Sequence, residues 1–278
     1  MLKKRVITAL WGIPVLVVAI WFDTPLPWFT ILVAVWGGLA VLEFYRLVAT
    51  SKVPPLTYFG LIWTLLFILS RDPALLTLIG PFFDQNRLTP LLLASAVILP
   101  LIWLLRREQK EKAFISWAWT TAGILYVGWL LSYLVALKGL NDGRNWILLV
   151  MFTTFASDTA AFFIGRTWGR HQLAPNISPK KTWEGAIAGA IGAIIVSLLF
   201  LLPTPLNLPM NWAQAILLGL IASVFGQLGD MVESLFKRNM GAKDSGNLLP
   251  GHGGVLDRID SIVFTGVVVY YYVLWIIQ

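Results

Sequence analysis

Hydrophobic residues in this chain fall in long blocks rather than in alternating or helical stripes. Blocks such as 6–22, 114–137 and 259–277 are close to the roughly 20 apolar residues that a helix needs to cross the hydrocarbon of a bilayer. The alternation over about 10 positions that marks membrane β-strands is not the pattern here. The blocks predict an all-α polytopic integral membrane protein.

Nine such blocks can be marked, and they predict about nine transmembrane helices in a single membrane domain. An additional apolar segment, 73–83, is too short to cross and is expected at the interface or in a re-entrant position. Residues 1–140 carry no recognisable motif, whereas 145–278 carry the polar motifs described below. The nine predicted spans are 6–22, 27–48, 56–70, 88–105, 114–137, 145–165, 185–203, 212–229 and 259–277.

The positive charges are distributed unevenly between the two sides that nine spans define. One side receives the N-terminus and the loops near 46–55, 106–113, 166–184 and 230–258. It holds all but four of the 21 Lys and Arg residues, the four being Arg71, Arg87, Lys138 and Arg144. Because cationic loops are retained in the cytoplasm, the N-terminus is predicted to be cytoplasmic and the C-terminus external.

Composition supports a membrane protein and limits its chemistry. Hydrophobic residues make up 58% of the chain and charged residues 13%, about half the charged share of a soluble domain. The net charge of +7 follows from topology, so no nucleic-acid partner is expected. The chain has no cysteine, which excludes disulfide and thiolate chemistry. The first block ends at Trp21-Phe22-Asp23 without a small-residue cleavage site, so we interpret it as a retained span and not a signal peptide.

The first polar motif follows the sixth predicted span. Asp158 is expected about 10 Å inside that span, where an ionised carboxylate is costly and usually marks a site or pathway. The alternative is an Asp paired with a neighbouring Arg to lock two helices. Residues 178–182 are expected to form a loop, because a residue before proline avoids helical geometry. Thr182 or Ser178 would then cap a helix beginning at Trp183.

A helix N-terminus beside Lys180 and Lys181 is suited to binding an anion. The alternative is an ordinary basic loop that touches anionic lipid headgroups.

The second polar motif contains four acids at two helix ends. Asp230 and Glu233 are three residues apart, as are Asp257 and Asp260, so each pair lies on one helical face. Four acids at one aqueous boundary suit a hard cation such as Mg²⁺. Glycines around His252 would let the backbone approach a ligand closely. The alternative is a structural network of ion pairs.

Acids that can hold a metal beside cations that can hold phosphates favour phosphoryl or nucleotidyl transfer, where positioning and charge neutralisation dominate. Neither a Walker A motif nor a dinucleotide fingerprint is present. An ion-coupled transporter is the main alternative outside enzymes, but no repeat is visible and the acids gather at one face. The alternative among enzymes is a CTP-dependent lipid kinase. A CDP-alcohol phosphatidyltransferase fits less well, because its Asp-Gly-x₂-Ala-Arg pattern is absent.

These motifs resemble those of a known family. The run Ser-Leu-Phe-Lys-Arg at 234–238, Lys-Asp at 243–244 and Pro-Gly-His-Gly-Gly-Val-Leu-Asp-Arg-Ile-Asp at 250–260 closely resembles the signature of the phosphatidate cytidylyltransferases, the CDP-diacylglycerol synthases of bacteria. Ser-Asp-Thr at 157–159 and Ser-Pro-Lys-Lys-Thr-Trp-Glu-Gly at 178–185 resemble that family's other conserved stretches. The motif-level resemblance covers roughly 155–262.

The resemblance implies a reaction and a set of site residues. CTP and phosphatidic acid would give CDP-diacylglycerol and pyrophosphate, with Mg²⁺ as cofactor and a second monovalent or divalent cation left open. The site would face the cytoplasm from the inner, or plasma, membrane. Asp230 and Asp257 would be the first metal ligands, followed by Asp260 and Asp158. Asp257, Asp230, Asp260 and Lys181 would then carry catalysis, with nucleotide or lipid phosphates bound by Ser178, Lys180, Lys181, Lys237, Arg238, Lys243, Arg258 and His252.

Oligomeric state stays open at this stage. The many small residues between positions 185 and 197 allow helices to pack closely, either within one chain or between two chains of a homodimer.

Overall fold

The computed structural model describes residues 14–22, 26–80, 84–106, 111–248 and 253–278, which are helical apart from one short β-hairpin. The chain divides into two compact units. Unit 1 contains Met1–Gly139 and Met240–Asp257, and unit 2 contains Leu140–Asn239 and Arg258–Gln278. The second unit begins close to the position where the sequence motifs begin. The single membrane domain expected from the sequence stays a prediction.

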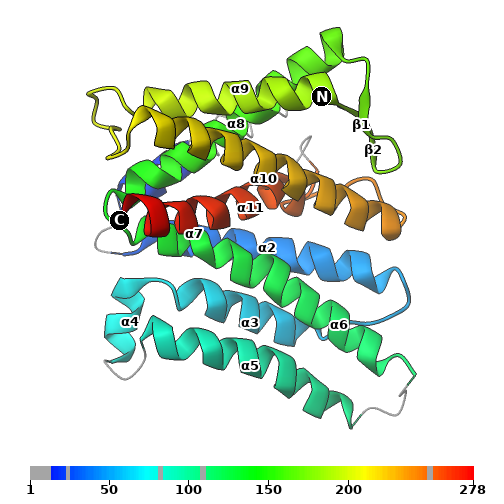
Figure 1. Ribbon diagram of the computed structural model, residues 1–278. Coiled ribbons are helices and arrows are strands. Elements are labelled where there is room, and N and C mark those ends of the chain that lie inside the picture. The colour runs from blue at the N-terminus through cyan, green and yellow to red at the C-terminus, as the bar shows by residue number, and fades with distance from the viewer. Residues whose placement is uncertain (1–13, 23–25, 81–83, 107–110, 249–252) are drawn as a thin grey trace. The chain divides into compact units, whose positions relative to one another are not determined.

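Unit 1 is a helical bundle in which α2 packs on α3, α6 and α7 (Figure 1). Buried Tyr45 of α2 donates a hydrogen bond of 2.7 Å to the carbonyl of Thr120 and so joins α2 to α6. Gly128 permits a close crossing with α3, because a Cβ at that position would lie 2.7 Å from Cα of Thr64. The helices are α2 (Trp28–Ala49), α3 (Thr57–Leu69), α4 (Pro73–Ile79), α5 (Gln85–Leu104), α6 (Ala113–Gly123), the π-helical η1 (Ile124–Trp129) and α7 (Leu130–Lys138).

The short apolar segment after α3 forms α4. Asp72 is its N-cap and accepts hydrogen bonds from the backbone N–H groups of Ala74 (2.8 Å) and Leu75 (3.2 Å), while Pro73 occupies the first turn. The hydroxyl of Thr30 in α2 also donates to this carboxylate, so the cap is buried against the bundle. With 7 residues, α4 is too short to cross a bilayer, in agreement with the prediction from its length.

Unit 2 is built on α8, α9 and α10, with α9 packed on both other helices (Figure 1). The last helix joins this layer through hydrogen bonds to α10 from Thr265 and from Tyr272, whose hydroxyl lies 3.0 Å from the Gln214 carbonyl. The elements are α8 (Gly143–Trp168), β1 (Gln172–Ala174), β2 (Ser178–Thr182), α9 (Trp183–Leu199), α10 (Trp212–Asn239), α11 (Leu256–Tyr272) and the π-helical η2 (Val273–Ile277).

The small residues of α9 are used for packing within the chain. A Cβ on Gly189 would lie 2.9 Å from Oγ of Ser157 in α8, and one on Gly192 would lie 3.1 Å from the carbonyl oxygen of Ala156. From α10, a Cβ on Gly219 would approach Cα of Ile194 to 2.7 Å. Contacts of this kind are typical of membrane helices that approach backbone to backbone. These glycines therefore serve the packing of helices within one chain. A homodimer stays a prediction.

Six helices in the described part of the chain are long and apolar enough to cross a membrane, which makes this a multi-pass membrane protein by composition. They are Trp28–Ala49, Arg87–Leu104, Ala113–Lys138, Gly143–Trp168, Trp212–Asn239 and Leu256–Ile277. Thr57–Leu69 and Trp183–Leu199 are apolar but shorter. Of the first predicted span, 14–21 is helical and the earlier residues lie outside the described part.

Candidate active site

A β-hairpin leads into α9 and positions the first motif. β1 and β2 pair antiparallel, with Gln172 opposite Thr182 and Ala174 opposite Ser178. The prediction of a loop at 178–182 is therefore wrong: the extended geometry imposed before Pro179 is used in a strand. The predicted cap is confirmed, because Thr182 Oγ1 accepts a hydrogen bond of 3.2 Å from the Gly185 N–H and α9 begins at Trp183.

Glu184 ties the hairpin to the first turn of α9. One of its carboxylate oxygens accepts from the N–H groups of Arg170 (3.1 Å) and His171 (3.3 Å), and the other lies 2.6 Å from His171 Nδ1. The side-chain hydrogen bond to His171 is the main reason why the pKa of Glu184 is lowered to about 2. Glu184 therefore stays ionised at the N-terminus of α9, where negative charge is favourable.

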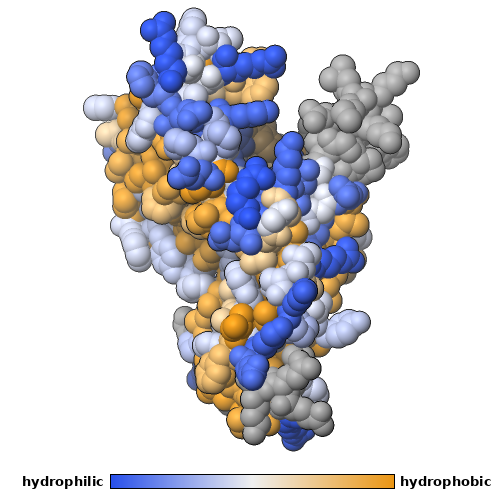
Figure 2. Space-filling model, turned by 90° about the vertical axis from the view of Figure 1, so that its right-hand side faces the viewer, coloured by the Kyte–Doolittle hydropathy of each residue, from blue (hydrophilic) through white to orange (hydrophobic). Residues whose placement is uncertain are grey.

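Unit 2 contains a cavity of about 240 Å³ at this end of α9. Hydrophilic side chains gather around the hairpin end of unit 2, in the upper part of Figure 2, while hydrophobic side chains cover its flank. The cavity receives groups from α8, β2 and α10. The polar residues that line it are Asp158, Lys180, Lys181, Thr182, Gln227 and Asp230.

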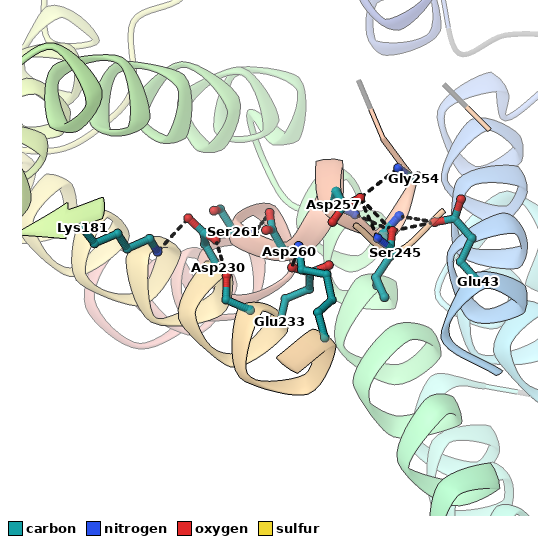
Figure 3. A network of polar contacts seen from close by, with 12 residues as sticks. Glu43, Lys181, Asp230, Glu233, Ser245, Gly254, Asp257, Asp260 and Ser261 are labelled. Atoms are coloured by element: carbon teal, nitrogen blue, oxygen red, sulfur yellow. Dashed lines mark hydrogen bonds and ion pairs between the residues drawn. The ribbon is translucent and has the colours of Figure 1, made fainter. Parts of the chain in front are cut away.

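Lys181 and Asp230 are joined within this cavity. The Lys181 ammonium lies 2.7 Å from Asp230 Oδ2 (Figure 3). It also lies 3.5 Å from the Gln227 carbonyl oxygen. The side chains are 23% and 35% exposed, so both remain accessible to a ligand. The structure thus brings together a predicted phosphate-binding cation and a predicted metal ligand that are separated in the sequence.

Three predicted metal ligands of unit 2 interact electrostatically. The carboxylates of Asp158 (α8), Asp230 (α10) and Asp260 (α11) repel one another, while Lys181 and Arg258 attract Asp158. Asp260 also accepts a 2.7 Å hydrogen bond from the Ser261 N–H. Gly229 lets α10 approach α11, because a Cβ on it would lie 2.5 Å from the Asp260 carbonyl oxygen.

The carboxylate oxygens of these three residues are the type of ligand that a hard cation prefers. In the described residues, however, no three His, Asp or Glu side chains stand close enough together to hold a metal ion. Lys181 supplies the positive charge beside Asp230 in this arrangement.

Asp257 lies in unit 1, at the start of α11, and belongs to a polar network within that unit. Its Oδ2 accepts hydrogen bonds from the N–H groups of Ser245 (3.0 Å) and Gly254 (2.8 Å), and Ser245 Oγ lies 3.0 Å from the same oxygen. That hydroxyl also lies 3.0 Å from Glu43 Oε2 of α2 (Figure 3). The predicted cage of four acids from the second motif stays a prediction.

Glu43 was missed by the sequence analysis. It lies inside a predicted span, and the rule that drew attention to Asp158, that acids within a span usually mark a site, applies to it equally. It was passed over because the surrounding residues 1–140 carry no recognisable motif.

The remaining predicted site residues have different surroundings. Lys237 is buried and forms an ion pair of 2.5 Å with fully buried Glu233 one turn earlier on α10. The helix α10 continues to Asn239, whereas the predicted span ended near 229. The first residues of the second motif therefore belong to a helix. His252 lies outside the described residues. Ser178 is half-buried, whereas Arg238, Lys243 and Arg258 are exposed.

The fold and the cavity define a class of protein: a polytopic membrane protein with a polar site made of carboxylates and ammonium groups. Comparison with known families narrows this class. A family model described as "Cytidylyltransferase family" matches residues 3–276, and the chain belongs to this family. The match extends well beyond the roughly 155–262 covered by the recognisable motifs, so the N-terminal half is part of the family as well.

Curated relatives agree over most of the chain. A phosphatidate cytidylyltransferase of Bacillus subtilis is 33% identical over 237 residues, covering 85% of this chain and 85% of the relative. One of Staphylococcus saprophyticus is 36% identical over 234 residues, covering 82% and 87%. One of Staphylococcus haemolyticus is 40% identical over 185 residues, covering 66% and 68%.

Proposed function

We propose that this protein transfers the cytidylyl group of CTP to phosphatidic acid and releases CDP-diacylglycerol and pyrophosphate. The observation that carries the proposal is the cavity in which Lys181 of the first motif meets Asp230 of the second. Membership of the cytidylyltransferase family and the named activity of its relatives support the same reaction.

The lipid phosphate is the nucleophile. A phosphate monoester has a second pKa of about 6, so phosphatidic acid is largely a dianion near neutral pH and needs no general base. One of its oxygens forms a bond to the α-phosphorus of CTP, and the bond from that phosphorus to the bridging oxygen of the β-phosphate breaks. The electron pair leaves with pyrophosphate.

The protein's task is to bring two anions together. Lys180, Lys181 and the N-terminus of α9 would bind nucleotide phosphates through charge-assisted hydrogen bonds. Asp230, Asp257, Asp260 and Asp158 would hold Mg²⁺. When bound, the ion would neutralise charge on the phosphates and the departing pyrophosphate.

We further propose nine membrane crossings with a cytoplasmic N-terminus and a site that faces the cytoplasm from the cell membrane. The six long apolar helices, the two shorter ones and the first predicted span support this number. The concentration of Lys and Arg in the loops on one side supports the orientation. This placement gives the site access to both CTP from solution and phosphatidic acid from the leaflet.

The test is an assay of the purified protein in detergent with labelled CTP, phosphatidic acid and Mg²⁺. Lipid-soluble CDP-diacylglycerol and an equal amount of pyrophosphate are expected, and Lys181→Ala and Asp257→Ala should remove most of the activity. Product formed by Asp257→Ala at the wild-type rate would contradict the metal-binding role of Asp257 but not cytidylyl transfer. No product from folded wild-type protein would contradict cytidylyl transfer, and lipid alcohols would then be tested as phosphate acceptors.

A further inference from the structure

We infer that Glu43 of α2 is a positioning residue that fixes the carboxylate of Asp257 through Ser245, so that Asp257 can bind the metal. The inference rests on the proposed function, because it concerns one of the acids assigned to the metal. It gives a role in the reaction to a residue of the N-terminal half, where the sequence shows no motif.

Glu43 is a buried acid with specific partners. It is 1% exposed, and its Oε2 accepts a hydrogen bond of 2.9 Å from the Leu256 N–H and one from the Ser245 hydroxyl at 3.0 Å. Leu256 is the first residue of α11, so Glu43 satisfies one of the N–H groups that a helix N-terminus leaves unpaired. The other oxygen, Oε1, is buried without a hydrogen-bond partner. Burying a carboxylate in this way is costly, which indicates a role other than stability.

Ser245 connects Glu43 to Asp257. Its hydroxyl lies 3.0 Å from both carboxylates but has one proton, so it can donate to only one of them at a time. The Asp257 N–H also points to this hydroxyl oxygen, at 3.3 Å. When the Ser245 hydroxyl donates its hydrogen bond to Glu43 and the Ser245 backbone N–H donates to Asp257, Ser245 joins the two acids. Hydrogen bonds to Oδ2 from Ser245 and Gly254 then fix the plane of the Asp257 carboxylate.

The glycines of the second motif are required by this network. A Cβ on Gly254 would lie 2.0 Å from Ser245 Oγ and 2.4 Å from Glu43 Oε2, and one on Gly246 would lie 2.5 Å from Glu43 Oε1. Gly253 has φ of +86°, a conformation that favours glycine. In the structure, Gly246 and Gly254 let the backbone approach Glu43 and Ser245. The expected approach of the glycines around His252 to a ligand stays a prediction.

The experiment compares four variants: Glu43→Leu, Glu43→Gln, Ser245→Ala and the double variant Glu43→Leu/Ser245→Ala. Leucine keeps the apolar volume without an acceptor, whereas the glutamine oxygen can still accept from Leu256 and Ser245. The readouts are Mn²⁺ binding measured by electron paramagnetic resonance without substrates, and the Mg²⁺ concentration that gives half-maximal transfer.

A matched control is Asp72→Asn. Asp72 is another buried acid of unit 1 that accepts from a helix N-terminus and from a hydroxyl, but it caps α4. Its replacement is expected to lower thermal stability and to leave Mn²⁺ affinity unchanged.

Glu43→Leu is expected to weaken Mn²⁺ binding about 10- to 100-fold, the effect typical of losing a partner that orients a ligand. Glu43→Gln should remain within about threefold of wild type, because its oxygen keeps both hydrogen bonds. Ser245→Ala should resemble Glu43→Leu, and the double variant should be no worse than either single variant, since one chain of contacts is interrupted once.

Three results would overturn the inference while leaving cytidylyl transfer intact. The first is wild-type Mn²⁺ affinity in an active or inactive Glu43→Leu protein. The second is an additive double variant, which would mean that Glu43 does not act through Ser245. The third is wild-type protein that makes product but binds no Mn²⁺. Failure of the proposed function is seen separately, as absence of product in the wild-type assay.

Discussion

The ammonium of Lys181 lies 2.7 Å from the carboxylate of Asp230, joining the strand before α9 to α10. Both side chains are partly exposed in the same cavity. In the proposed reaction these two groups serve different ligands, a phosphate and a metal ion. Each partner of the ion pair is therefore expected to exchange the other for its own ligand in the proposed reaction.

Lys181→Gln should lower kcat/KM for CTP about 10- to 100-fold. A hydrogen bond to a charged group contributes about 1.5–3 kcal/mol, and 1.4 kcal/mol corresponds to a factor of ten. Steady-state assays at saturating phosphatidic acid would measure this. Lys180→Gln, at the neighbouring and more exposed position, should have a smaller effect. Equal activity of Lys181→Gln and wild type would contradict a phosphate-binding role.

Removing the same lysine should strengthen cation binding in the absence of CTP. Lys181 competes for Asp230 and places a positive charge among Asp158, Asp230 and Asp260. Lys181→Gln is therefore expected to bind Mn²⁺ several-fold more tightly, whereas Asp230→Asn should bind it more weakly. Titration followed by electron paramagnetic resonance would measure both. Weaker binding by Lys181→Gln would mean that the lysine does not compete with the metal.

Glu233 and Lys237 should affect stability more than catalysis. Their ion pair is buried in α10, and removing one partner of such a pair typically costs about 3–5 kcal/mol. Glu233→Leu is expected to lower the thermal unfolding temperature in detergent, and Glu233→Leu/Lys237→Met should recover most of the loss. If Lys237→Met instead lost activity at unchanged stability, its predicted role in binding a substrate phosphate would be supported.

Gly219→Val should loosen the packing of α9 on α10. A Cβ on Gly219 would lie 2.7 Å from Cα of Ile194, and backbone atoms cannot move aside as a side chain can. Overpacking of this kind costs about 1–3 kcal/mol, measurable as a lower thermal unfolding temperature. Leu220→Val, at the exposed neighbouring position, is the control and should change stability little. Wild-type stability of Gly219→Val would show that the helices can separate without cost.

Local chemistry made several elements predictable. α9 begins at Trp183 with Thr182 as its cap, because a hydroxyl before a helical segment satisfies a free N–H within one turn. The C-terminal end of α10 was not predicted correctly, because that prediction followed hydropathy. Hydropathy falls after 229, but polar residues continue the helix to Asn239, where Lys237 can neutralise Glu233.

Sequence alone determined that this is a helical membrane protein and where its polar motifs lie, and it predicted which residues bind phosphate and metal. These properties depend on hydropathy and on residue types at short spacing. Only the tertiary structure decided that Lys181 meets Asp230, and that Glu43 reaches Ser245 across 202 positions of the chain. Such contacts depend on how helices pack. The sequence neighbours of a lone acid in an apolar span do not indicate which distant backbone N–H or hydroxyl will donate a hydrogen bond to it.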